Sequence, residues 1–526
     1  MPSPARIPGT SPCPIPWLPE KASARAPICK KIEVLFMRYS GILMHISSLP
    51  GPYGIGTMGD QARRFVDFLK SARQHYWQIL PVGPTGYGDS PYQSFCTYAG
   101  NHYLIDLNEL MAQGLLLPEE AAPQGTCPDQ VDYGLLYTQR TEALRKAYGR
   151  FDPEETGFVR FVREEQDWLE DYCLFMALKT AFGGLEWLRW PEELRFRRPQ
   201  ALEKYRRTLA SEIGFHRFLQ YQFYTQWTAL RRYAGDNGIE IIGDVPIYVP
   251  LDSSDVWANP GCFQLDSRTL HPERVAGVPP DYFNADGQLW GNPLYNWDAM
   301  AADGYAWWIR RLKASARLFD VVRIDHFRGF ESYWAVPYGD TSAKNGCWNK
   351  GPGMDLIATV KQALPSLRFI AEDLGYVTPE VMQLVQDSGF PGMKVLEFAF
   401  DSREAHDYMP HTYTANSVCY TGTHDNETLI QWAEAASPED YRLACRYLGK
   451  SESESICSAM IRAGMASVSD TFIVQMQDWL ELGAEARMNH PGTLGGRNWR
   501  WRCREEAISS DLARRIAETT ALYRRG

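Results

Sequence analysis

An arginine and an aspartate interrupt an apolar run of the chain, where burying a charge is costly. The run VVRIDHF (321–327) carries Arg323 and Asp325 at alternate positions. Alternate residues of a strand share one face, so we expect both side chains to point the same way. The guanidinium would then lower the pKa of Asp325 and keep this carboxyl ionised. An ionised carboxylate shielded from water is a good nucleophile at a sugar carbon.

A second acidic pair lies in the run FIAEDLG (369–375), where Glu372 and Asp373 are neighbours. Neighbouring residues of a strand face opposite ways, so only one of the two is expected to reach the same cavity. A glutamate that shares a cavity with other acids tends to have a raised pKa, which suits a general acid.

Polar residues also end further apolar runs: Asp244, His424, Asp425, Gln477 and Asp478. A single charged residue at a strand end is more often a cap or a salt-bridge partner than a catalyst. Polar clusters at several strand ends favour one shared site. The alternative is a divalent-metal site of the kind found in barrel sugar isomerases. Its ligands would be Asp244, His326, Glu372 and Asp425.

Eight short apolar runs predict the strands that position these residues. They are residues 41–46, 76–81, 239–249, 321–327, 369–375, 393–400, 418–425 and 472–478. Near-continuous apolar runs are typical of parallel strands covered on both faces, and helical patterns lie between them. Eight strands alternating with helices predict an α/β fold, a (β/α)8 TIM barrel, with its site at the C-terminal ends of the strands.

The spacing of the runs predicts the domain organisation. Residues 107–238 are mostly helical in pattern and are expected to form an insertion, a helical subdomain of a single catalytic barrel over 37–526. Residues 1–36 are Pro-rich, lack an apolar signal core and are expected to be a disordered tail.

The amino-acid composition limits the classes of partner that the chain is expected to bind. The net charge of −10 argues against nucleic acid and anionic membranes, and no window is apolar enough for a membrane span. The 11 cysteines are scattered without metal-ligand spacing, which predicts free thiols in a reducing, cytoplasmic setting and no metal or other cofactor. The many aromatic residues, 28 Tyr, 23 Phe and 17 Trp, suit stacking on sugars, although most aromatic side chains belong to the core.

Long motifs resemble one known family. They include WQILPVGPTGYGDSPYQSF (77–95), AGVPPDYFNADGQLWGNPLYNW (276–297), VRIDHFRGFESYW (322–334), AEDLG (371–375) and YTGTHDN (420–426). The chain resembles the 4-α-glucanotransferases, the amylomaltases or disproportionating enzymes of glycoside hydrolase family 77, from about Ser40 to about Arg502. One departure is Glu397, at a position where many relatives carry glutamine.

The resemblance implies roles for the three acids. Asp325 matches the family's nucleophile, Glu372 its general acid/base, and Asp425 the third carboxylate, which grips sugar hydroxyls. The implied reaction moves α-1,4-glucan segments between maltooligosaccharides by a retaining double displacement. Retention predicts that the Asp325 and Glu372 carboxyl groups lie about 5 to 5.5 Å apart.

The resemblance also implies contacts to sugar. The substrate-binding residues that it predicts are Tyr87, Ser90, Tyr92, Asp244, Asp281, Gln288, Trp290, Arg323 and His424. Asp281, Gln288 and Trp290 fall in a lid loop, which we expect to exclude water so that the intermediate meets sugar first. A retaining α-glucan hydrolase and a catalytically inactive glucan-binding scaffold stay open as alternatives, because fold and acids do not decide the acceptor.

Overall fold

Eight parallel strands form the central sheet of the computed structural model, which describes residues 38–86, 88–122, 125–280, 285–375, 377–403 and 408–526. They are β1 (Tyr39–Leu43), β2 (Tyr76–Gln78), β3 (Glu240–Pro246), β6 (Val321–Asp325), β9 (Arg368–Ala371), β10 (Gly392–Val395), β11 (Ser417–Tyr420) and β12 (Thr471–Gln475). Their order is β10–β11–β12–β1–β2–β3–β6–β9. The outer strands also meet, because the Ala371 amide of β9 donates to the Pro391 carbonyl beside β10 at 2.9 Å. The sheet is therefore a nearly closed barrel, which confirms the predicted (β/α)8 fold.

Several of the strands end earlier than the apolar runs suggest. The run at 393–400 leaves β10 after Val395 and continues as a 3-10 helix over Leu396–Phe400. The run at 472–478 leaves β12 after Gln475 and continues as α20 (Met476–Trp479). Apolar periodicity cannot separate a buried strand from a buried helical turn, so the expected C-terminal ends of these strands were wrong. Gln477 and Asp478 consequently lie in a helix, and His424 and Asp425 lie in the loop after β11.

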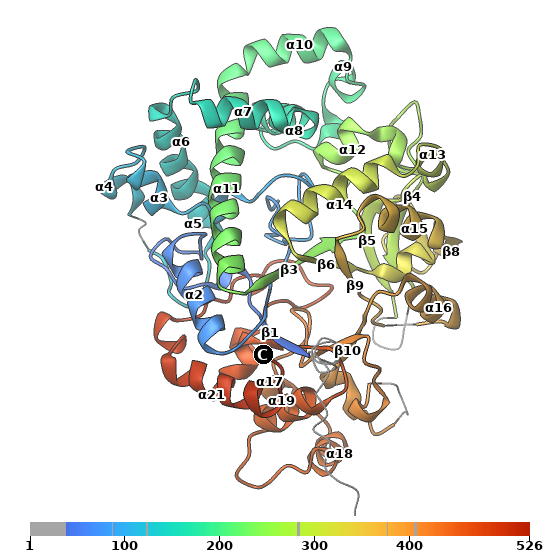
Figure 1. Ribbon diagram of the computed structural model, residues 1–526. Coiled ribbons are helices and arrows are strands. Elements are labelled where there is room, and N and C mark those ends of the chain that lie inside the picture. Colours follow the sequence, from blue (N-terminus) through green and yellow to red (C-terminus); the bar gives the residue numbers. More distant parts are fainter. Residues whose placement is uncertain (1–37, 87, 123–124, 281–284, 376, 404–407) are drawn as a thin grey trace, which may run out of the picture. The chain divides into compact units, whose positions relative to one another are not determined.

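Helices occupy most of the chain between β2 and β3. They are α3 (Leu107–Ala112), α4 (Pro118–Ala121), α5 (Tyr133–Leu135), α6 (Thr141–Arg150), α7 (Thr156–Glu164), α8 (Gln166–Ala181), α9 (Glu192–Arg195), α10 (Pro199–Thr208) and α11 (Ala210–Asp236). The long helix α11 runs from this group down to the barrel and leads into β3 (Figure 1). Its Trp227 donates to the Leu318 carbonyl at 3.1 Å, which ties the helix to the segment before β6.

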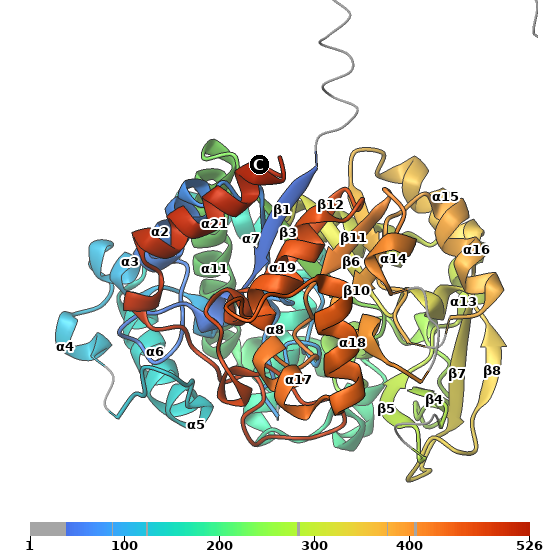
Figure 2. The same ribbon diagram turned by 90° about the horizontal axis from the view of Figure 1, so that it is seen from below.

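A second sheet, which the sequence patterns did not predict, packs against the barrel. It contains β4 (Arg274–Val278), β5 (Gln288–Pro293), β7 (Ser332–Pro337) and β8 (Cys347–Lys350). The four strands are antiparallel in the order β5–β4–β7–β8. Figure 2 shows this sheet on the side of the barrel opposite α3–α6. The sheet carries Gln288 and Trp290 on β5, next to the end of β6.

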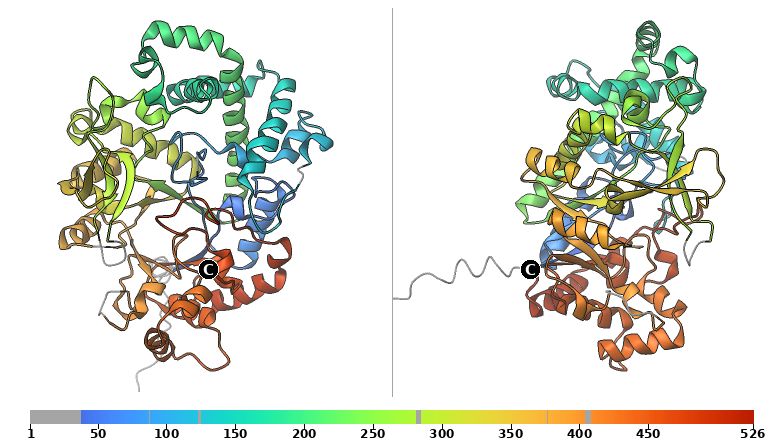
Figure 3. Two further views of the ribbon diagram at one scale, coloured as in Figure 1. Left: turned by 180° about the vertical axis from the view of Figure 1, so that it is seen from behind. Right: turned by 90° about the vertical axis from the view of Figure 1, so that its right-hand side faces the viewer.

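Ten further α-helices complete the helices of the described residues. They are α2 (Asp60–Ser71), α12 (Ser254–Ala258), α13 (Trp297–Ala302), α14 (Ala306–Leu318), α15 (Met354–Ala363), α16 (Pro379–Ser388), α17 (Leu429–Ala435), α18 (Pro438–Leu448), α19 (Ile456–Ala466) and α21 (Ser510–Leu522). The C-terminal helix α21 lies beside α2 (Figure 3). Every helix in the described part of the chain is too short or too polar to span a bilayer.

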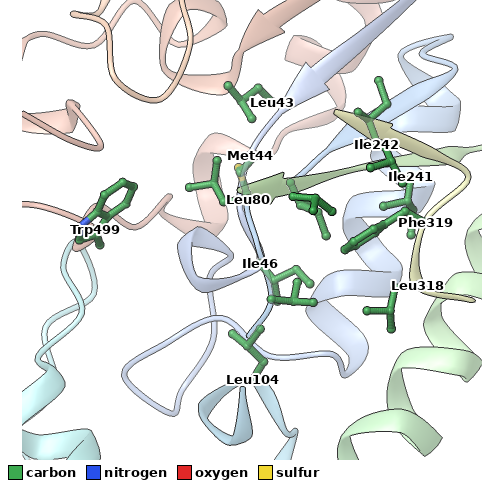
Figure 4. Packing of buried hydrophobic residues seen from close by; sticks show 14 of the residues in the cluster. Leu43, Met44, Ile46, Leu80, Leu104, Ile241, Ile242, Leu318, Phe319 and Trp499 are labelled. Atoms are coloured by element: carbon green, nitrogen blue, oxygen red, sulfur yellow. The ribbon is translucent and has the colours of Figure 1, made fainter. Parts of the chain in front are cut away.

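The core fills the space between the barrel and its helices. Ile241 and Ile242 of β3 pack near Phe319, which directly precedes β6 (Figure 4). Gly243 makes this packing possible, because a Cβ at that position would lie 2.1 Å from the Phe319 ring. β3 and β6 pair in the register that places Asp244 beside Arg323.

Candidate active site

The arginine in β6 is bound by two carboxylates rather than one. Asp244 lies beside Arg323 in the register between β3 and β6. The Nη1 group of Arg323 donates to Asp244 Oδ1 and Oδ2 at 2.8 and 2.6 Å, and to Asp325 Oδ1 at 2.9 Å. The side chains of Arg323 and Asp244 are only 4% and 1% exposed, whereas that of Asp325 is 30% exposed. Asp325 is thus the member of this group that faces the solvent-accessible site.

Aromatic side chains line the same side of the barrel mouth. The Tyr92 hydroxyl donates to Asp244 Oδ2 at 2.8 Å and lies 3.4 Å from His424 Nδ1. The Tyr92 and His424 rings stack with centroids 5.0 Å apart, and Trp499 lies within 6 Å of both rings. Two of the predicted sugar contacts, Tyr92 and His424, are therefore joined to the Arg323 group by direct contacts.

Glu372 lies directly after β9, next to Asp325. Its Oε2 accepts the His326 amide at 2.6 Å and its Oε1 accepts the Leu374 amide at 2.8 Å. Burial raises the pKa of Glu372 to about 7, and the nearby Asp325 charge adds to the rise while Arg323 opposes it. The carboxyl can hold a proton near neutral pH, as a general acid requires.

The neighbouring Asp373 points the other way. Its Oδ1 accepts the Met393 amide of β10 at 2.7 Å, and its carboxyl lies against Gly392. Burial raises the pKa of Asp373. Asp373 joins β9 to β10 at the closure of the barrel, so Glu372 alone of this pair has its carboxyl beside Asp325.

Asp425 lies in the loop between β11 and α17, and a partner distant in sequence holds it. Asn489 Nδ2 donates to Asp425 Oδ1 at 2.7 Å, and His424 Nε2 lies 3.3 Å from the same oxygen. Arg487 Nη2 donates to the Asp425 carbonyl at 2.9 Å. The Asp425 side chain is 46% exposed, so this third carboxylate is open to a ligand.

Residue His326 has an unusual backbone. It follows Asp325 and has φ 53° and ψ 47°, the left-handed conformation that non-glycine residues adopt at a cost. This conformation turns its amide toward Glu372 and places its ring edge-on to Trp290, with centroids 4.8 Å apart. Burial lowers the pKa of His326 to about 4, so the ring is neutral at pH 7. His326 links strand β5 to the predicted general acid.

The other predicted contacts are placed as follows. Gln288 Oε1 accepts the Trp290 indole N–H at 3.1 Å, and Ser90 Oγ accepts the Tyr92 amide at 3.3 Å. Tyr87 and Asp281 lie outside the described residues. Asp244 has both oxygens engaged by protein groups, so a sugar contact by Asp244 stays a prediction.

Two of the four ligands expected for the alternative metal site, Asp244 and His326, contact other protein groups instead. Asp244 binds Arg323, whose positive charge stands where a cation would have to bind. The His326 ring packs against Trp290. Among the described residues, no three His, Cys, Asp or Glu side chains come together as metal ligands. The constellation is one of carboxyl groups and an arginine.

Comparison with known proteins decides the family. The family model described as 4-α-glucanotransferase matches residues 44–508. The chain belongs to the 4-α-glucanotransferase family. It is 46% identical over 486 residues to the 4-α-glucanotransferase of Clostridium butyricum, covering 92% of this chain and 100% of that protein. It is 49% identical over 494 residues to the enzyme of Streptococcus pneumoniae, covering 93% and 97%.

A solved structure agrees with the fold. The amylomaltase from Streptococcus agalactiae, solved in complex with acarbose, superposes with a TM-score of 0.90 at 43% identity. The match covers 93% of this chain and 100% of that one. This member of the family is therefore an enzyme of the glucanotransferase type with a glycoside-hydrolase barrel, as the sequence motifs implied.

In this 4-α-glucanotransferase three site residues escaped the sequence reasoning. Asn489 and Trp499 follow β12 and reach Asp425 and His424 across the barrel mouth. His326 was considered as a ligand of the alternative metal site, whereas its amide donates to Glu372. The motif EARMNHPG (485–492) contains Asn489, so its resemblance to the family was a signal that could have identified this residue.

Proposed function

We propose that this glucanotransferase works by a retaining double displacement with Asp325 as nucleophile and Glu372 as general acid/base. The observation that carries the proposal is the contrast between the two carboxyl groups. Asp325 accepts a hydrogen bond from the Arg323 guanidinium, and Glu372 has a pKa raised to about 7. Two neighbouring acids in contrasting environments are suited to opposite roles.

The first half-reaction breaks the donor glucan. Glu372 donates its proton to the glycosidic oxygen as Asp325 attacks the anomeric carbon, and a glycosyl ester with Asp325 forms. Arg323 offsets the charge of Asp325 before attack. Asp244 shares the same guanidinium, so Arg323 is held in place and cannot neutralise Asp325 completely.

The second half-reaction transfers the segment. The Glu372 carboxylate takes the proton from the 4-hydroxyl of an acceptor glucan, and that oxygen attacks the anomeric carbon of the glycosyl ester. The bond from this carbon to Asp325 breaks, the Asp325 carboxylate is released, and the new α-1,4 bond forms with net retention. We assign Asp425 to the sugar hydroxyls, supported by its 46% exposure and by its fixed orientation on Asn489. Donor and acceptor are proposed to be α-1,4-glucans and maltooligosaccharides, on the names of the relatives.

The binding groups follow from the same geometry. Tyr92 and His424 form an aromatic wall beside Asp325, and stacking on sugar faces suits such a wall. Trp290, placed by His326 and Gln288, is proposed to shield the ester from water. A cytoplasmic location is proposed from the scattered cysteine pattern.

The test uses maltotriose as the only substrate. Transfer yields glucose and a ladder of longer maltodextrins, and Asp325→Asn should abolish both products. A product mixture that contains only shorter sugars would support the hydrolase alternative. An Asp325→Asn enzyme with full transfer activity would refute the assignment of the nucleophile.

A further inference from the structure

The segment from Thr421 to Leu429 carries His424 and Asp425. A buried acid, Asp478, hydrogen-bonds to both ends of this segment. Asp478 of α20 accepts the Thr421 hydroxyl on Oδ2 at 2.6 Å and the Leu429 amide on Oδ1 at 2.8 Å. Its side chain is 1% exposed. One carboxyl group therefore holds both ends of the segment.

A second buried acid, Glu397, lies under the middle of this segment. Its side chain is 7% exposed, and its carboxyl group hydrogen-bonds to the backbone of Glu427. Its own amide donates to the Thr421 carbonyl at 3.3 Å. A Cβ on Gly422 would lie 2.4 Å from Glu397 Oε1, so the segment passes directly over this carboxyl. Oε1 has no hydrogen-bond partner among the described residues.

The charges around Glu397 disfavour its ionised form. It faces Asp478 on α20, Glu427 on the segment and Arg487 from the loop after β12. Arg487 already forms an ion pair with Glu427 at 3.3 Å and donates to the carbonyls of Asp425 and Asn489 at 2.9 and 2.8 Å. Burial, followed by the charges of Asp478 and Glu427, raises the pKa of Glu397 well above its usual range. A carboxylate here would be repelled by the carboxylates of Asp478 on α20 and Glu427 on the segment.

We propose that Glu397 is a positioning residue whose buried carboxyl group fixes the Thr421–Leu429 segment and so orients Asp425. The inference rests on the proposed role of Asp425 in gripping the sugar. Glu397 does not touch substrate in this account. It acts through the backbone of Glu427. From the other side, Arg487 donates to the Asp425 carbonyl and Asn489 donates to the Asp425 carboxylate.

The proposal predicts how three substitutions differ. Glu397→Gln keeps the shape and a neutral polar group, so kcat with maltotriose at pH 7 should stay within about twofold of the parent enzyme. Glu397→Met keeps the volume but loses the hydrogen bond, and should lower kcat about tenfold with a smaller change in KM. Asp425→Asn serves as the reference for complete loss of the third carboxylate.

A stability measurement supplies a readout that does not depend on catalysis. A carboxyl group whose folded pKa is raised contributes stability below its unfolded pKa, and this contribution is lost as pH rises through the folded pKa. Glutamine does not titrate, and Asp478 is present in both proteins. The Tm of Glu397→Gln minus that of the parent should therefore increase as the pH rises above the pKa of an unfolded glutamate, about 4.3.

The outcomes separate the two levels of the argument. If Asp425→Asn is inactive but Glu397→Met keeps the parent kcat, the positioning role of Glu397 is wrong and the proposed function stands. If Asp425→Asn is fully active, the proposed function fails first. If Glu397→Met does not fold, the Tm comparison decides, because a difference that is constant with pH would overturn the neutral-acid assignment.

Discussion

Replacing Arg323 with methionine isolates the electrostatics of the site. The substitution keeps most of the side-chain volume and removes the guanidinium charge that Asp244 contacts at 2.6 and 2.8 Å. The Asp244 side chain is 1% exposed, so it cannot recover solvation by turning outward. Burial already raises the pKa of Asp244, and Arg323 opposes that effect. Without Arg323 the folded protein escapes the buried charge by binding a proton.

The charge penalty is limited by the free energy of protonating Asp244. From a reference pKa of about 3.9, that limit is about 4 kcal/mol at pH 7 and about 1.5 kcal/mol at pH 5. With an unfolding entropy of about 2 cal/mol/K per residue, these values lower Tm by about 4 °C and about 1.5 °C for a chain of this size. The loss grows with pH, because the folded pKa of Asp244 rises while its unfolded pKa does not change.

The assay is calorimetric measurement of Tm at pH 5 and pH 7. The proteins compared are the parent, Arg323→Met and the double variant Asp244→Asn/Arg323→Met. The double variant lacks the titrating group, so its Tm deficit should change little between the two pH values. An Arg323→Met deficit that is equal at both pH values, or smaller at pH 7, would refute the reasoning.

Three further predictions concern catalysis. The kcat/KM for maltotriose should fall tenfold per pH unit above about pH 7, because Glu372 must be protonated in the first step. A pH profile that is flat to about pH 9 would contradict this. Glu372→Gln should lower kcat about 10²- to 10⁴-fold. Glycine at position 326 tolerates φ 53° and keeps the backbone amide that donates to Glu372, whereas the β-branched side chain of valine resists that conformation. His326→Gly should therefore have a higher kcat than His326→Val. Equal kcat values would count against the backbone role of His326. Trp290→Ala should lower the ratio of transfer to hydrolysis with maltotriose, and an unchanged ratio would argue against a shielding role.

The barrel was predictable because its strands are short apolar runs separated by helical patterns. Helix boundaries with capping residues were also predictable, as at α16, where Thr378 accepts the Val381 amide and Gly389 ends the helix with φ 71°. The ends of β10 and β12 were not, because the buried residues after Val395 and Gln475 are as apolar as the strands themselves. The strands of the small antiparallel sheet carry mixed polar and Gly-rich sequences that gave no clear alternation.

The proposed catalytic acids were predicted from strand alternation and family motifs, but their partners depend on register and distance. Asp244 meets Arg323 only because β3 and β6 pair at that register, which a single sequence does not specify. Asn489 reaches Asp425 from 64 residues away along the chain. The left-handed backbone of His326 has no signature in residue type. Strand register, contacts between distant segments and local backbone conformation are therefore the features of the site that the sequence alone could not supply.

The most direct test of the central claim is to capture the sugar ester on the enzyme. Glu372→Gln, incubated with an α-maltosyl fluoride whose leaving group needs no proton, should accumulate a maltosyl ester. Peptide mass spectrometry should locate this ester on Asp325, and the Asp325→Asn/Glu372→Gln protein should remain unlabelled. A label on another residue, or release of product with inverted anomeric configuration and no ester, would contradict the account.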